Sequence, residues 1–193
     1  MTDDLPWPLP DHLDLRGRLV AAWSRERGYH DLLHLAEVLA RLTELGGSGD
    51  IDVVLAAWFH DAVYDGAGDD EERSARLAEV ELAGISSVDA AEVGRLVRLT
   101  ERHRPEPGDH SGEMLCDADL AVLASSADRY AAYVAGVRRE YADVPDDDFR
   151  RGRAAVLRDL QAKPTLFHTA YARENWEPAA RANLAAELTE LTR

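Results

Sequence analysis

The sequence predicts an all-α fold, organised as one helical bundle in a single domain over residues 1–193. Alternating β-branched residues, which are typical of half-buried strands, are scarce, whereas Ala, Leu, Arg and Glu recur at helical spacing. No linker, repeat or low-complexity tract divides the chain, and 193 residues are enough to bury one sizeable core.

Three helices are predicted before residue 66. The first spans about Asp11–Arg27 and stops at Gly28, and the second spans about Asp31–Leu45 and stops at Gly46-Gly47, because glycine commonly ends a helix. Asp50 can cap a third helix over Ile51–Tyr64. Its first residues, IDVVLAAWF, are mostly apolar, so we expect this helix to be buried.

The rest of the chain predicts further helices separated by capping residues, a loop and prolines. They are Asp69–Leu82, a helix capped by Ser86 or Ser87 that reaches about His103, a long helix over Glu113–Tyr141, Asp146–Ala162 after a break at Pro145, and Thr165–Arg193 with an interruption near Pro178. The segment 104–112 contains two prolines and two glycines and predicts a loop.

Composition limits the functions that the chain can have. With 37 acidic against 22 basic residues the net charge is -15, which disfavours binding to a nucleic-acid polymer or an anionic membrane. A small anionic substrate stays compatible, because a bound cation can reverse the local field. The single cysteine, Cys116, excludes an intramolecular disulfide framework. We see no signal peptide and no apolar stretch of about 20 residues, so we expect a cytoplasmic protein.

The placement of the histidines is informative. His30 and His34 lie four residues apart and share one face of the second helix. His60-Asp61 closes the buried third helix. His103 ends the fifth helix, and Asp117 and Asp119 follow in the next one. These groups lie near helix ends, where a bundle can bring them together around a cation.

His60-Asp61 carries most of this argument. An imidazole and a carboxylate beside an apolar run are costly to bury unless they are paired or bound to metal. Neighbouring side chains on a helix point about 100° apart, so both reach one ion only where the helix ends or is distorted. The dipeptide lies at such an end.

The pattern His34, His60-Asp61 and a later Asp resembles the signature of the HD superfamily of metal-dependent phosphohydrolases. The chain is similar to a bacterial branch of predicted metal-dependent HD phosphohydrolases along nearly its whole length. The motifs that carry the resemblance are RGYHDLLH (27–34), AAWFHDAVYD (56–65), EERSA (71–75), His103, CDADLAVLAS (116–125), YAAYVAGVRREYADVP (130–145), FRRGRAAVL (149–157), LFHT (166–169) and ARANLAAEL (180–188).

The resemblance implies an HD-type helical bundle and roles for individual residues. His34, His60 and Asp61 match three metal ligands, and the fourth ligand is Asp119 or Asp117, of which we favour Asp119. His30 and His103 match positions that approach a second metal or the substrate phosphate, or they are structural histidines.

Catalytic and substrate-binding candidates are less specific. Asp65 or Glu71 could orient the attacking water, although Asp65 could equally belong to a turn and Glu71 to an exposed helix face. Arg27, Arg139 and Arg153 are candidates for binding phosphate, since a guanidinium group matches phosphate oxygens. A solvated ion pair is the alternative for each arginine.

Two His and two Asp suit a divalent ion, namely Mn, Fe, Co, Ni or Zn, with Mg also considered. We therefore expect a hydrolase acting on a phosphate ester or pyrophosphate bond of a small phosphorylated substrate, with a nucleotide as one candidate. The alternative is an HD-fold module that binds metal or nucleotide without turnover. The number of ions, the substrate and the existence of a homodimer stay open.

Overall fold

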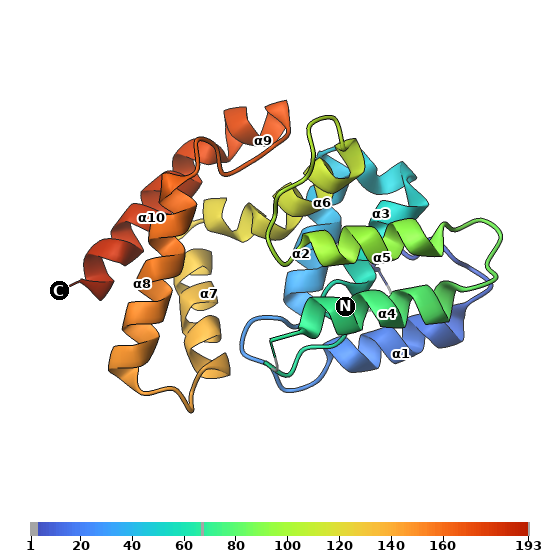
Figure 1. The fold of residues 1–193 in the computed structure, drawn as a ribbon, viewed down its shortest axis with the longest axis horizontal. Coiled ribbons are helices and arrows are strands. Elements are labelled where there is room, and N and C mark those ends of the chain that lie inside the picture. The colour runs from blue at the N-terminus through green and yellow to red at the C-terminus, as the bar shows by residue number, and fades with distance from the viewer. Residues whose placement is uncertain (1–3, 67, 193) are drawn as a thin grey trace. The chain divides into compact units, whose positions relative to one another are not determined.

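The computed structural model describes residues 4–66 and 68–192, and within these ranges it contains helices and no strand (Figure 1). The prediction of an all-α fold is therefore confirmed. The α-helices are α1 (Leu13–Trp23), α2 (Leu32–Glu44), α3 (Ile51–Phe59), α4 (Asp70–Leu82), α5 (Ala90–Leu99), α6 (His110–Leu120), α7 (Ala127–Glu140), α8 (Asp146–Ala162), α9 (Ala170–Asn175) and α10 (Glu177–Leu191). Two short 3₁₀ helices, η1 (Gly47–Gly49) and η2 (Ala121–Ala124), complete the set. None of the described helices is long and apolar enough to cross a membrane.

The chain divides into two compact units, which are described separately. Unit 1 comprises Met1–Glu26 and His30–Asp119, and unit 2 comprises Arg27–Tyr29 and Leu120–Arg193.

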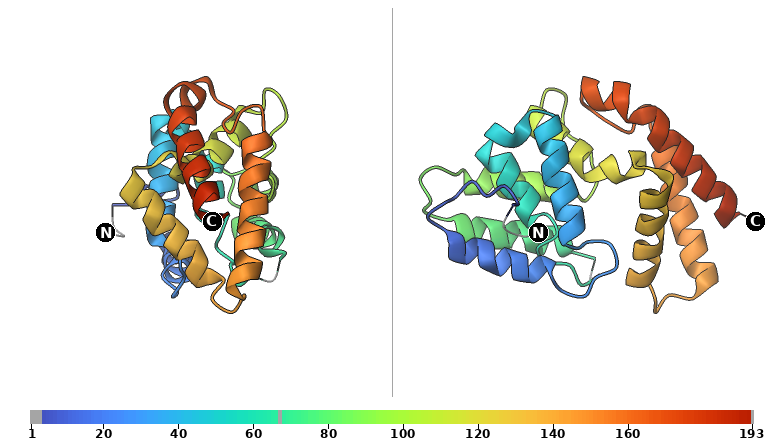
Figure 2. Two further views of the ribbon diagram at one scale, coloured as in Figure 1. Left: turned by 90° about the vertical axis from the view of Figure 1, so that its left-hand side faces the viewer. Right: turned by 180° about the vertical axis from the view of Figure 1, so that it is seen from behind.

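Unit 1 is organised around α3. The residues from Val53 to Phe59 are all buried, as the apolar sequence predicts. α3 packs against α2, α4 and α5, and α4 and α5 lie side by side (Figures 1 and 2). Fully burying a large apolar side chain such as Trp58 or Leu55 stabilises the fold by roughly 1.5–3 kcal/mol. This core fixes the C-terminal end of α3, where His60 follows.

Several predicted helix boundaries are wrong. The first helix ends at Trp23, before Gly28. The third ends at Phe59 rather than Tyr64, and the fifth ends at Leu99 rather than His103. Asp89, and neither Ser86 nor Ser87, caps α5 by accepting from the amides of Ala91 and Glu92. The helix expected over Glu113–Tyr141 is broken into α6, η2 and α7. Ser125 is extended and the Ser126 side chain accepts from Arg129 N, which starts a new helix there.

The C-terminal predictions agree more closely. α8 spans Asp146–Ala162 as expected, and the interruption near Pro178 is real, because α9 ends at Asn175 and α10 starts at Glu177. His110, expected in a loop, is the first residue of α6.

Unit 2 has one backbone contact that permits only glycine. Gly28 lies against α7 at Gly136, where a Cβ on Gly136 would come within 2.7 Å of Gly28 O. Arg139 Nη2 donates to the same carbonyl at 2.9 Å, and Tyr29 N donates to Glu140 Oε1 at 2.7 Å. The segment 27–29 is thus attached to α7 through its backbone.

This contact can be tested with two glycines in helices. Gly136→Ala should lower the free energy of unfolding by about 1–3 kcal/mol, because backbone has to move. Gly152→Ala on α8, where a Cβ meets nothing within 4 Å, should raise it by about 0.5–1 kcal/mol through helix propensity. Chemical denaturation followed by circular dichroism measures both, and equal effects would contradict the close contact.

Candidate metal centre

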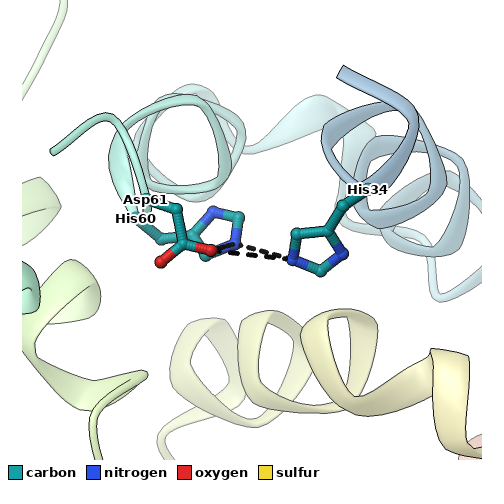
Figure 3. A group of neighbouring side chains, drawn as sticks. All are labelled: His34, His60 and Asp61. Carbon is teal, nitrogen blue, oxygen red and sulfur yellow. Dashed lines mark hydrogen bonds and ion pairs between the residues drawn. The ribbon is translucent and has the colours of Figure 1, made fainter. Parts of the chain in front are cut away.

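Three buried side chains meet at the end of α3 (Figure 3). His34 Nε2 and His60 Nε2 face each other at 3.2 Å. Asp61 Oδ2 lies 3.2 Å from His60 Nε2 and 3.8 Å from His34 Nε2. The exposed fractions of His34, His60 and Asp61 are only 2%, 1% and 8%. These donor atoms are close enough to hold one metal ion, as predicted for these three residues.

Asp119, on the last turn of α6, lies beside the same group. Its Oδ1 is 3.1 Å from His34 Nε2 and 3.6 Å from His60 Nε2. Asp117 is also buried in α6, but side chains two positions apart on a helix point about 200° apart. Of the two aspartates left open by the sequence, Asp119 is the one that contacts both imidazoles.

Helix ends position these residues. Asp31 caps α2 by accepting from the amides of Leu33 and His34, which places His34 in the first turn. His60 is the C-cap of α3, and its amide donates to Ala56 O at 2.9 Å. Neighbouring side chains within a helix point about 100° apart. Asp61 lies outside the helix, so its side chain can reach the same ion as His60.

A hydrogen bond fixes which nitrogen of His60 faces the group. His60 Nδ1 lies 2.7 Å from Ala57 O, and a carbonyl oxygen only accepts, so Nδ1 carries the hydrogen and donates. In the neutral ring Nε2 is then the atom with the free electron pair, as a metal ligand requires. Trp23, itself fully buried, packs against this ring with centroids 5.2 Å apart.

The pKa shifts show that the histidines and aspartates of the site interact strongly through their charges. Burial lowers the pKa of His34. Burial also opposes protonation of His60, but the carboxylates of Asp61 and Asp119 outweigh it and raise the pKa of His60 to about 9. Burial would raise the pKa of Asp61, yet His60 lowers it to about 2. Without a cation, a proton on His60 offsets only one of the two negative charges of the carboxylates. Two imidazole nitrogens and two ionised carboxylates are also a donor set that fits a divalent ion.

His103 supports Asp119 from the other side. His103 Nε2 lies 2.8 Å from Asp119 Oδ2. His103 has φ 50°, and it is the only non-glycine residue with a positive φ among those described. A non-glycine residue in this region costs some free energy, and such residues concentrate at functional sites.

The other candidates of unit 1 have different surroundings. His30 stacks on Tyr64 with ring centroids 4.1 Å apart, and its ring is 5.7 Å from that of His34. Glu71 is half-buried, and its pKa is raised by burial and by the charge of Asp61. Asp65 is 54% exposed, and both of its oxygens accept from Arg73 at 2.8 Å.

The three arginine candidates belong to unit 2. Arg153 forms a buried ion pair with Glu187, with Nε 2.7 Å from Oε1, and Tyr130 donates to the same carboxylate. Arg139 donates to Gly28 O, and Arg27 is half-buried. Arg153 therefore has a structural partner, and phosphate binding by these arginines stays a prediction.

Several residues that contact His60 or the segment after Asp61 were given no site role from the sequence. Trp23 was assigned only to a helix, and Ser74 and Asp70 to no role. The available sequence signal for Ser74 was its place three and four residues before Leu77 and Ala78 on the predicted helix, since a hydroxyl on an apolar face needs a partner.

No family model, curated protein or solved structure matches the chain. The HD superfamily assignment therefore stays a prediction.

Metal content tests the site directly. After reconstitution, the wild type should retain a divalent ion that His34→Ala and Asp61→Ala lose, because each variant removes one buried donor. His110→Ala is the matched control, since the His110 side chain is 85% exposed at the start of α6. Elemental analysis after gel filtration measures the content. Equal metal in all four proteins would contradict a site at these residues.

Metal binding should also release a proton. The pKa of His60 is raised to about 9 in the metal-free protein, so below that pH a proton occupies the ring and must leave before Nε2 binds a cation. Affinity should therefore rise with pH by up to about tenfold per unit between pH 6.5 and 9. Calorimetry in buffers of different ionisation enthalpy counts the protons, and a pH-independent affinity would contradict this reading.

Proposed function

We propose that this chain is a metal-dependent hydrolase of phosphate ester or pyrophosphate bonds in a small molecule. One observation carries the proposal: imidazoles and carboxylates from α2, α6 and the C-terminal end of α3 converge in a buried cluster. The resemblance of its motifs to the HD superfamily supplies the reaction class. The net charge of -15 favours a small substrate, with a nucleotide as one candidate, over a nucleic-acid polymer.

In this proposal His34, His60, Asp61 and Asp119 hold the ion. When bound, a divalent ion there would supply Lewis-acid chemistry, activating water and neutralising phosphoryl charge. The chain itself orients the ligands: Ala57 O fixes the His60 ring, and His103 fixes Asp119. His103 is thus assigned to positioning, while His30, beside His34, is assigned to contact with substrate.

Glu71 is the better candidate for handling a proton. Its raised pKa brings it closer to neutral pH, where general acid–base catalysis is most effective. Both carboxylate oxygens of Asp65 already accept hydrogen bonds from the guanidinium group of Arg73. We therefore assign the proton-handling role to Glu71 and a structural ion pair to Asp65.

A substrate panel tests the proposal. Phosphomonoesters, phosphodiesters and pyrophosphate compounds are incubated with the protein and Mn, Co, Ni or Mg, and released phosphate or phosphorylated product is measured. The wild type and His110→Ala should show metal-dependent turnover, and His60→Ala and Asp61→Ala should show none. Metal binding without turnover of any compound would favour the regulatory module instead.

The same assay separates the two carboxylate candidates. Glu71→Gln should lower kcat by about 10²–10⁴-fold while metal content is unchanged, because it removes a proton acceptor but no ligand. Asp65→Asn should keep most of the activity. The reverse order would assign the role to Asp65.

A further inference from the structure

The chain that leaves His60-Asp61 is held by a side chain of α4. Asp61 lies in the turn after α3, where Ala62 N donates to Phe59 O at 2.9 Å. Two residues further on, Val63 N donates to Ser74 Oγ at 3.0 Å, and the Ser74 hydroxyl donates to Val63 O at 3.1 Å. One hydroxyl thus satisfies both backbone groups of a residue that lies outside any helix.

Asp70, in the first turn of α4, binds the same segment further along. Its Oδ2 accepts from Gly66 N at 2.8 Å and from Asp65 N at 3.3 Å. Its Oδ1 accepts from Arg73 at 3.3 Å, and Arg73 also holds the carboxylate of Asp65. Side chains of α4 therefore contact the segment at Val63, Asp65 and Gly66.

These contacts are inside the protein. Ser74 is 0% exposed and Asp70 is 6% exposed, and their buried neighbours on α4 include Ala75 and Ala78. A buried hydroxyl or carboxylate is favourable only when it is bonded, and alanine has the higher helix propensity. What Ser74 and Asp70 add over alanine is their attachment to the segment after Asp61.

We propose that Ser74 and Asp70 are positioning residues that fix Asp61 as a ligand. The inference rests on the proposed metal centre. Consecutive Cα atoms are about 3.8 Å apart, so the anchor at Val63 lies within about 8 Å of Asp61 along the chain. A ligand set has to be held within about 0.5 Å, and removing a group that orients a ligand typically weakens metal binding by about 10–100-fold.

Cobalt titration distinguishes a loss of ligand positioning from a general loss of protein stability. Co²⁺ is added to metal-free wild type, Ser74→Ala and Ser111→Ala, and binding is followed by visible absorption. Ser111 is the matched control, because its hydroxyl also joins two elements: it donates to Asp50 Oδ2 at 2.9 Å, at the far end of α3 from His60. We expect Ser74→Ala to weaken Co²⁺ binding by about 10–100-fold and to alter the absorption bands, and Ser111→Ala to keep the wild-type Kd and bands.

Denaturation of the metal-free proteins gives the second readout, since both substitutions should lower stability by similar amounts. A Kd of Ser74→Ala equal to that of the wild type would overturn the proposal. Equal weakening by Ser111→Ala would do so as well, because it would make the effect one of general stability.

Asp70 provides an independent pair if Ser74→Ala does not fold. Asp70→Asn keeps an oxygen that accepts from Gly66 N and should bind Co²⁺ almost as the wild type does, whereas Asp70→Ala should bind more weakly. Identical Kd values for the two variants would overturn the proposal. If the wild type itself does not bind Co²⁺, the metal centre fails; if it binds and no variant differs, only the positioning role fails.

Discussion

The packing of unit 1 depends on the compensation of charge at the C-terminal end of a buried apolar helix, α3. α3 buries every residue from Val53 to Phe59, and His60 and Asp61 follow directly. An ionised group in such surroundings is costly unless an opposite charge or a cation lies beside it. The carboxylates of Asp61 and Asp119 lie beside the imidazoles of His34 and His60. The carboxylates and the charged imidazole are stable in this buried place only because they lie beside each other. The ends of α2, α3 and α6 therefore have to meet.

Polar contacts join α3 and α6 at both of their ends. At the start, Asp50 caps α3 and accepts from Ser111 of α6 at 2.9 Å. At the end, His60 Nε2 lies 3.6 Å from Asp119 Oδ1. The candidate ligands take part only in the contact at the C-terminal ends, whereas the Asp50–Ser111 contact lies at the opposite end of both helices.

The sequence predicted those parts of this arrangement that depend on local chemistry. The apolar run before His60 indicated a buried helix, Asp50 and Asp31 lie at helix starts, and His34, His60 and Asp61 meet as expected. The helix break at Ser125-Ser126 was missed. The helical spacing over 113–141 predicted one continuous helix, and the two serines were not read as the end of one helix and the cap of the next. Contacts such as Ser74 with Val63 could not be predicted, since they depend on how α4 packs against the turn. Sequence spacing likewise could not decide whether Asp117 or Asp119 is the fourth candidate ligand. The orientation of α6 about its axis determines which of the two faces the imidazoles.

Charge balance also bears on the proposed action of so acidic a chain on an anionic substrate. Burial opposes ionisation of Asp61 and Asp119, but the charge of His60 helps to lower the pKa of both carboxyl groups. Arg73 is already paired with Asp65 and Asp70. A phosphate arriving at this metal-free cluster would meet carboxylates on several sides. A divalent ion in place of the proton adds one further positive charge at the same point, where burial weakens screening by solvent. The field then becomes more positive only near the cluster, while the net charge of the chain stays negative. Exchange of a proton for a metal ion would thus select a small anionic substrate as well as prepare the chemistry.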